Sequence, residues 1–195
     1  MLPMTDQRSL ALWAADCAEH VLPYFETVRP KDDRPRKAIE EGRAWARSGL
    51  PMRMSVIRAA SLAAHAAARE AKGDNAACFA ARAAGQAVAT AHVLQHAYGP
   101  SYYALKAVAA ADPSHAEVAI AKEYNWQLRR LPMNLRKGWQ DWQSRRLPKD
   151  LKLILERVKT RKQKAIVAYP KNKAHFLRLI RFGLAHSQYS FKRRS

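Results

Sequence analysis

Apolar and polar positions along this chain follow a helical period, and no stretch alternates between them as a half-buried strand does. Alanine, the best helix former, supplies 23 of the 53 residues from 59 to 111. Glycine and proline breaks divide the chain into about nine predicted helices, at residues 8–25, 34–47, 52–71, 75–97, 101–111, 115–130, 133–145, 149–168 and 172–187. The pattern therefore predicts an all-α fold.

Alanine-rich helices have narrow side chains, so their axes can approach closely while larger residues fill the remaining gaps. In the first two predicted helices the candidate core residues are Leu12, Trp13, Val21, Leu22, Phe25, Ile39 and Trp45. Together they predict a compact Ala-rich bundle. The helix expected at 149–168 differs, because it combines an apolar stripe with a strongly basic face.

Charge divides the chain into two parts. Residues 1–125 carry 15 lysines and arginines against 13 acidic residues, whereas residues 126–195 carry 20 against 3. The overall formal charge of +19 suits an anionic partner or surface. We expect an Ala-rich helical domain over residues 1–130 and a strongly basic helical extension over 131–195, packed on the domain or following it.

A short repeat lies at this boundary. WQLRRLPMNL at residues 126–135 returns as WQSRRLPKDL at 142–151. The copies start 16 residues apart, which is too short for the common helical solenoids, whose units are roughly 34 residues or more. We expect each copy to be a helix–proline–helix corner. In such a corner the arginine pair ends one helix, leucine leaves the helical dihedrals, and proline opens the next helix.

Residues able to carry chemistry are few. His92 and His96 in TAHVLQHA are four positions apart, which would place both imidazoles on one helical face at a spacing that a metal ion can bridge. The zinc-protease motif would need Glu where Val93 stands, and no second pair of ligands has a suitable spacing. We therefore favour a structural role for the two histidines, and we predict no metal and no cofactor.

Signatures of catalysis are also missing from the sequence. It contains no G-x-S-x-G, no cysteine beside an evident histidine partner, and only seven glycines, too few for a phosphate-cradling loop. Glu40 and Glu41 are consecutive and would point about 100° apart on a helix, which makes a poor acid–base pair. We do not expect an enzyme.

The basic extension is a candidate binding region for an anionic partner. Its candidate residues are Arg129, Arg130, Arg145, Arg146, Lys159, Arg161, Lys162 and Lys164, with tryptophans interleaved between the arginine pairs. Cations that neutralise phosphates, with aromatic rings that stack on bases, are typical of non-specific nucleic-acid binding. Two alternatives stay open: a solvated basic face anchored by its aromatic residues, and attachment to an anionic membrane surface.

The cysteines and the N-terminus bear on the compartment. Cys17 and Cys78 lie in Ala-rich contexts, where cysteine acts as a small hydrophobic residue, and a reducing cytoplasm fits them best. The N-terminus lacks the basic start and apolar run of a secretory signal. Residues 83–105 are uncharged, but several polar residues, a glycine and a proline interrupt them, so we expect no transmembrane segment.

Four stretches within residues 12–110 match one known pattern in order. They are LWAADCAEHVLPYFE, RPKDDRPRKAIEEGRAWARSG, LAAHAAAREAKG and AARAAGQAVATAHVLQHAYGPSYYALKAV. Together they resemble the immunity-five-like family, a group of immunity proteins of bacterial polymorphic toxin systems. The family-motif residues in this chain are Asp33, Arg34, Pro35, Arg36, Trp45, His65, His92 and His96.

The resemblance implies a small all-α cytoplasmic protein without catalysis, which protects its producer by binding a cognate toxin. Gln86 departs from the pattern, because His commonly follows Ala-Ala-Gly in the family. An inhibitor of a nuclease would more naturally be acidic. Either the toxin surface is acidic, or the near-neutral residues 1–125 bind it. Nucleic-acid binding through the basic extension is the alternative function.

Overall fold

The structure, a computed structural model, describes residues 4–51 and 53–168, and in these residues it is all-α without strands, as predicted. The α-helices are α1 (Met4–Val28), α2 (Arg34–Ser48), α3 (Met54–Glu70), α4 (Asn75–Ala89), α5 (Tyr98–Ala111), α6 (Ala116–Arg130), α7 (Arg136–Arg146) and α8 (Lys149–Ala168). Three short 3-10 helices lie between them: η1 (Leu94–Ala97), η2 (Pro113–His115) and η3 (Met133–Leu135). The ninth expected helix, at 172–187, lies outside the described residues.

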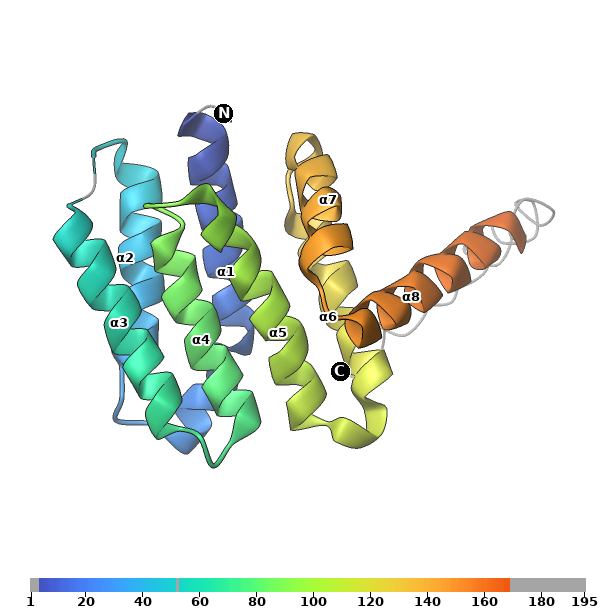
Figure 1. Cartoon of the computed structure of the whole chain (residues 1–195), viewed down its shortest axis with the longest axis horizontal. Helices are drawn as coiled ribbons and strands as arrows, with labels where there is room; N and C mark the ends of the chain where they lie inside the picture. The colour runs from blue at the N-terminus through green and yellow to red at the C-terminus, as the bar shows by residue number, and fades with distance from the viewer. Residues whose placement is uncertain (1–3, 52, 169–195) are drawn as a thin grey trace, which may run out of the picture. The chain divides into compact units, whose positions relative to one another are not determined.

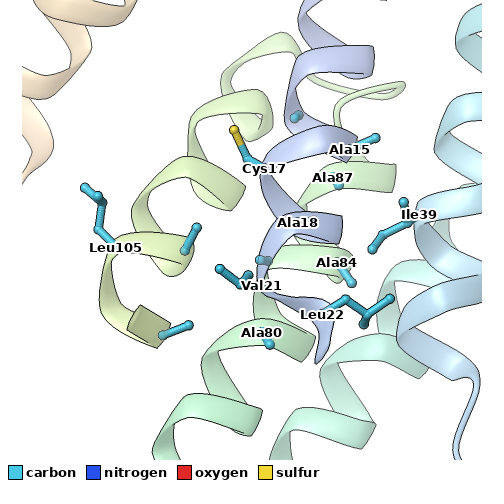
Figure 2. Packing of buried hydrophobic residues seen from close by; sticks show 14 of the residues in the cluster. Ala15, Cys17, Ala18, Val21, Leu22, Ile39, Ala80, Ala84, Ala87 and Leu105 are labelled. Atoms are coloured by element: carbon cyan, nitrogen blue, oxygen red, sulfur yellow. The ribbon is translucent and has the colours of Figure 1, made fainter. Parts of the chain in front are cut away.

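Helix α4 lies at the centre of the bundle and packs against α1, α2, α3 and α5. Figure 1 shows α3, α4 and α5 side by side, each antiparallel to its neighbour. Figure 2 shows Ala80, Ala84 and Ala87 of α4 among the buried side chains of α1 and α2. Small side chains allow close approach, and a Cβ built at Gly42 of α2 would lie only 3.3 Å from the Cα of Val88.

The candidate core of the first two helices is nearly all buried. Trp13, Val21, Leu22, Phe25, Ile39 and Trp45 are buried, and Leu12 is partly exposed. Cys17 and Cys78 are buried free thiols. Burial raises the pKa of the Cys17 thiol well above its ordinary value, and the nearby carboxylates of Glu123 and Asp16 raise it further. Both cysteines therefore act as small core residues.

The helix expected at 75–97 is shorter than predicted. α4 ends at Ala89, because the side-chain amide of Gln7 in α1 donates hydrogen bonds to the carbonyl oxygens of Thr90 at 2.9 Å and Ala91 at 3.3 Å. These bonds satisfy acceptors that a continuing helix would have used. The break expected at Gly99-Pro100 is also wrong. Pro100 lies in the first turn of α5, where its missing N–H costs nothing.

Both copies of the repeat are corners of the predicted kind. α6 ends at Arg130 and α7 at Arg146, and the next residues, Leu131 and Leu147, have extended dihedrals before their prolines. Each of these leucines is buried, and so are the equivalent glutamines Gln127 and Gln143. The shared sequence therefore encodes a shared pattern of burial as well as a shared turn.

The compact unit that contains the bundle runs from Met1 to Leu155, past the boundary expected near residue 130, and residues 156–195 form a second unit. The buried hydrophobic side chains of the described residues beyond that boundary are Leu131, Leu135, Trp139, Leu147, Leu151 and Leu155, all part of the main core. Trp139 is fully buried between Trp13 of α1 and Tyr124 of α6. The start of the basic region thus completes the core. No helix in the described part of the chain is long and apolar enough to cross a membrane.

A buried polar network ties α6 to α1 and α5. The Glu123 carboxylate, 3% exposed, accepts a hydrogen bond from the Gln127 amide at 2.8 Å and pairs with the His20 imidazole at 2.6 Å. The amide oxygen of Gln127 accepts a bond from the Ser101 hydroxyl at 2.6 Å, and its backbone carbonyl accepts one from the Trp13 indole at 3.0 Å. These partners satisfy groups that would otherwise be costly to bury.

Candidate functional site

A small cleft opens between α3, the C-terminal end of α4 and the turn that carries η1. Its volume is about 170 Å³, and its lining residues are Met54, Ile57, Arg58, Ser61, Leu62, His65, Gln86, Ala89, His92 and His96. In Figure 1 the start of α3 and the turn after α4 lie at the same end of the bundle. The fold thus gathers three family-motif histidines, from three separate elements, around one opening.

The structure corrects the expected arrangement of His92 and His96. His92 lies in a turn and His96 in η1, so the expectation that both project from one helical face is wrong. The cause is the early end of α4 at Ala89. They still line the same cleft, together with His65 from α3. Across the described residues, no group of three histidine, cysteine or carboxylate side chains is arranged to hold a metal ion.

The ring of His65 lies directly against the backbone of Gly85 in α4. A Cβ at Gly85 would lie 2.9 Å from the Cε1 of that ring, so any larger residue there would displace the ring from this position. Beside it, the Ser61 hydroxyl donates a hydrogen bond to the Gly85 carbonyl oxygen at 2.9 Å. The Nδ1 of His65 is buried and has no hydrogen-bond partner within the described chain. Such an orphaned polar atom at a cleft is a candidate contact for a ligand.

Gln86 fixes the position of His96. Its amide oxygen accepts a hydrogen bond from the Nδ1 of His96 at 2.7 Å, and a Cβ at Gly99 would lie 2.8 Å from the Gln86 side chain. Because Nδ1 is the donor, Nε2 of the neutral ring carries a lone pair and becomes a donor only on protonation. The residue that departs from the family pattern therefore sets the tautomer of a cleft histidine.

The cleft disfavours the protonated form of its buried imidazoles. Burial lowers the pKa of His65 below its ordinary value, and Arg82, Arg69 and His96 lower it further. Burial likewise lowers the pKa of His96, with a smaller contribution from His92. No described aspartate or glutamate lines the cleft to offset these effects. Both rings therefore favour the neutral form more than a free imidazole does.

These lowered pKa values predict that stability falls as the pH drops below about 6.5, the ordinary pKa of histidine. In that range the unfolded chain takes up protons before the folded chain does, so the free energy of unfolding decreases until the folded pKa values are passed. Urea unfolding at pH 7.5 and 5.5 measures the loss. The carboxylates with lowered pKa, such as Glu19 and Asp32, act only below about pH 4.5 and leave this window clear.

The matched control is the double variant His65→Asn, His96→Asn, compared with the wild type at the same two pH values. Comparing the change with pH within each protein removes any constant effect of the substitutions on folding. The double variant should lose less stability than the wild type. An equal loss in both proteins would show that other groups cause the pH dependence.

An apolar rim borders the cleft. Met54 and Leu62, which line it, are 41% and 59% exposed, and Leu50 is exposed in the connection just before α3. Arg58 lies between Met54 and Leu62 on α3, and no described carboxylate is within ion-pair distance of it. Exposed apolar side chains around an arginine are typical of protein–protein interfaces. Arg58 and Leu62 are not among the residues predicted from the sequence, although Met54, Arg58, Ser61 and His65 recur at helical spacing.

The remaining family-motif residues lie away from the cleft. The Arg34 guanidinium donates to Asp32 at 2.8 Å and to Glu70 at 3.1 Å, at the far end of α3. Arg36 pairs with Glu26 of α1 at 2.6 Å. Close by, Asp33 pairs with Lys37, and Pro35 is buried at the start of α2. These contacts join the first three helices, so the structure gives this group of residues a scaffold position.

Trp45 also belongs to the scaffold. It is buried near the C-terminal end of α2 in a small cluster with Ala11 and Ala46. The Arg8 guanidinium lies 5.0 Å from the centre of its ring and donates a hydrogen bond to its backbone carbonyl at 2.8 Å. Trp45 therefore fixes the end of α2 against α1.

The two arginine pairs of the basic region lie at opposite ends of α7. The Arg136 guanidinium donates to the Leu131 carbonyl at 3.2 Å and Trp139 stacks on Tyr124, so α7 runs back along α6. The pair 129–130 is thus beside the start of α7, whereas the pair 145–146 ends this 11-residue helix, roughly 16 Å away. The two arginine pairs are therefore separated by the length of α7.

The candidate residues of the basic region differ in their surroundings. The Arg130 guanidinium lies 4.0 Å from the centre of the Trp126 ring, which in turn stacks on His20 at 3.8 Å. Arg129, Arg145 and Arg146 are exposed. The remaining candidates, Lys159, Arg161, Lys162 and Lys164, belong to α8, and the structure does not describe their side chains.

A larger groove, of about 480 Å³, lies beside α5. Phe79, Tyr102, Leu151 and Ile154 contribute to its mostly apolar lining. Its main cation, Lys106, lies over the rings of Phe79 and Tyr102, 4.1 Å and 5.6 Å from their centres. Small-molecule sites usually combine an apolar pocket with convergent polar groups. This groove has no motif residue and no such convergence.

Comparison with known proteins gives one match. A family model described as "Imm-5 like putative immunity protein" matches residues 2–134. The matched range includes every residue that lines the cleft and ends inside the first copy of the repeat. No curated protein and no solved structure matches the chain.

Proposed function

The chain belongs to the Imm-5 like putative immunity protein family, and from this membership we propose that it is a non-catalytic cytoplasmic protein that binds and neutralises a cognate bacterial toxin. The single observation that carries the proposal is the family match over residues 2–134, which spans α1 to α6. Immunity proteins act by occupying their toxin, so a binding surface is the feature that this function needs.

The cleft of α3, α4 and η1 is the surface that suits this role best. Its volume of about 170 Å³ is smaller than the roughly 300–1,000 Å³ of typical small-molecule sites. A pocket of this size suits a single side chain of a protein partner. Exposed Met54 and Leu62 beside it supply apolar surface that binding would remove from water, which strengthens association.

The cleft also reconciles the toxin hypothesis with the charge of the chain. It lies in the near-neutral part, residues 1–125, rather than in the basic extension. Its lining combines the cation Arg58 with three histidines, and no described carboxylate lies among them. The partner surface that fits it is therefore acidic. The two alternatives left by the sequence, an acidic toxin surface and binding by the near-neutral part, then describe one interface.

Co-expression tests the proposed function. The chain should co-purify with the toxin encoded by the adjacent gene, as a complex that survives gel filtration. A complex of the chain with the toxin, together with no binding of the chain to nucleic acid, supports a protein partner. The competing outcome is salt-sensitive binding of the full chain to any nucleic acid, with no toxin complex. That result would favour the alternative function of the basic extension and overturn the proposal.

A further inference from the structure

Acidic residues are scarce around the cleft. Between Gly42 and Ala111 the carboxylates are Glu70 and Asp74. Glu70 pairs with Arg34, and Asp74 caps α4 by accepting a hydrogen bond from the backbone N–H of Ala77 at 2.9 Å. Both lie near the 71–74 connection, at the end of α3 and α4 remote from the cleft (Figure 1). Nothing anionic in these two helices neutralises Arg58 and the imidazoles.

The polar atoms of the cleft suit an anion whose binding is accompanied by protonation of a histidine. The buried Nδ1 of His65 has no described partner. His96 presents a lone pair at Nε2 while it is neutral, because its Nδ1 donates to Gln86. A bound carboxylate would be repelled by that lone pair and attracted by an imidazolium N–H. Occupation by an anion therefore favours protonation of His96.

The surrounding charges determine how readily His65 and His96 are protonated before an anion binds. His65 faces Arg69 of α3, Arg82 of α4 and His96, and His96 faces His92. Each of these groups disfavours a further positive charge while the cleft is empty of anions. An entering carboxylate reverses the balance for all of them, so binding and proton uptake are coupled.

The rim distinguishes a carboxylate from a phosphate. A nucleic-acid backbone presents a continuous line of phosphates and would leave the exposed Met54 and Leu62 against charged, hydrated groups. A glutamate or aspartate on a protein surface has apolar neighbours that can cover these side chains. The small volume suits the end group of one side chain.

We propose that the cleft formed by Arg58, His65, His92 and His96 binds the carboxylate of an acidic side chain of the toxin and takes up a proton in doing so. The identity of the partner rests on the proposed function. The anion site itself rests on the residues that line the cleft.

The test uses the full chain and a blocked amino acid, N-acetyl-glutamate amide, as the probe. Imidazole NMR signals of His65 and His96 should shift in a saturable manner, with a Kd on the order of 1 mM, as expected for so small a ligand. The affinity should rise as the pH falls from 8 to 6, approaching tenfold per pH unit where one proton is taken up. Arg58→Gln should weaken binding at least fivefold, and Arg129→Gln, which removes the same charge elsewhere, should change it less than twofold.

Three results would overturn the proposal. One is an equal response to N-acetyl-glutamine amide, which has the same shape without the charge. Another is an affinity that does not change with pH. The last is tighter binding of inorganic phosphate than of the carboxylate probe.

Failure of the proposed function is distinguishable, because then the probe binds as described while the toxin of the adjacent gene does not. If the toxin binds and the probe does not, only the anion site fails.

Discussion

The variant Trp139→Ala should lose about 3–5 kcal/mol of its free energy of unfolding. The Trp139 side chain is 0% exposed, and its ring packs on Trp13 edge-on at 5.7 Å and on Tyr124 face-on at 5.2 Å between centroids. Truncation removes both aromatic contacts and leaves a cavity. Since domains of this kind are stable by about 5–15 kcal/mol, a large share of the stability depends on this residue. Urea unfolding followed by circular dichroism measures the change.

Trp126→Ala is the matched control. Trp126 is partly exposed and stacks on His20 and Arg130, so its loss should cost about 1 kcal/mol. A second arm uses truncation: a chain ending at Leu155 should fold, whereas a chain ending at Arg130 lacks Trp139 and the leucines that follow it and should not. Equal costs for the two tryptophans, or cooperative folding of the shorter chain, would place α7 outside the core.

The second large effect concerns the partner. Leu62→Asp should weaken toxin binding on the order of 100-fold, or about 3 kcal/mol. Leu62 is 59% exposed on the rim of the cleft, so an aspartate there leaves the fold intact. It replaces apolar contact surface and adds a negative charge beside the site proposed for the partner's carboxylate. Isothermal titration calorimetry with a catalytically inactive toxin measures the affinity.

Leu153→Asp gives the same change of side chain at a similar exposure, 55%, and Leu153 does not line the cleft. It should leave the affinity within about twofold of the wild type, as expected for a surface residue outside an interface. If Leu153→Asp weakened binding as much as Leu62→Asp, the loss would reflect the added negative charge rather than the cleft.

Much of the fold could be predicted because its signals are local. Alanine content and the proline breaks specify the helices, and the Leu-Pro steps at 131–132 and 147–148 specify both corners. The end of α4 could not be predicted, because the residue that caps it, Gln7, is 83 positions away from Thr90 in the chain. Tertiary hydrogen bonds of this kind leave no pattern in the segment that they terminate.

The candidate site could be predicted only in part. The family resemblance identified His65, His92 and His96, but it did not separate them from the scaffold residues Arg34 and Trp45. That separation depends on how α3 packs on α4, where the His65 ring lies directly against Gly85. The helical spacing that places Arg58 on the face of His65 does not by itself identify it as a binding residue, since an arginine on an Ala-rich helix is ordinarily solvated.

The arrangement of the basic region could not be predicted from the sequence either. The sequence suggested that Arg129, Arg130, Arg145 and Arg146 could act together, and the antiparallel course of α7 against α6 separates the two pairs. That course is set by the burial of Trp139, a contact between residues far apart in the chain.

Growth protection tests the central claim most directly, namely that this chain neutralises a toxin through the cleft of α3, α4 and η1. Bacteria that express the toxin of the adjacent gene would be supplied with the wild-type chain, Leu62→Asp or Leu153→Asp, each at equal soluble level. The wild type and Leu153→Asp should restore growth, and Leu62→Asp should not. Growth restored equally by all three variants would contradict the role of the cleft, and growth restored by none would contradict the proposed function.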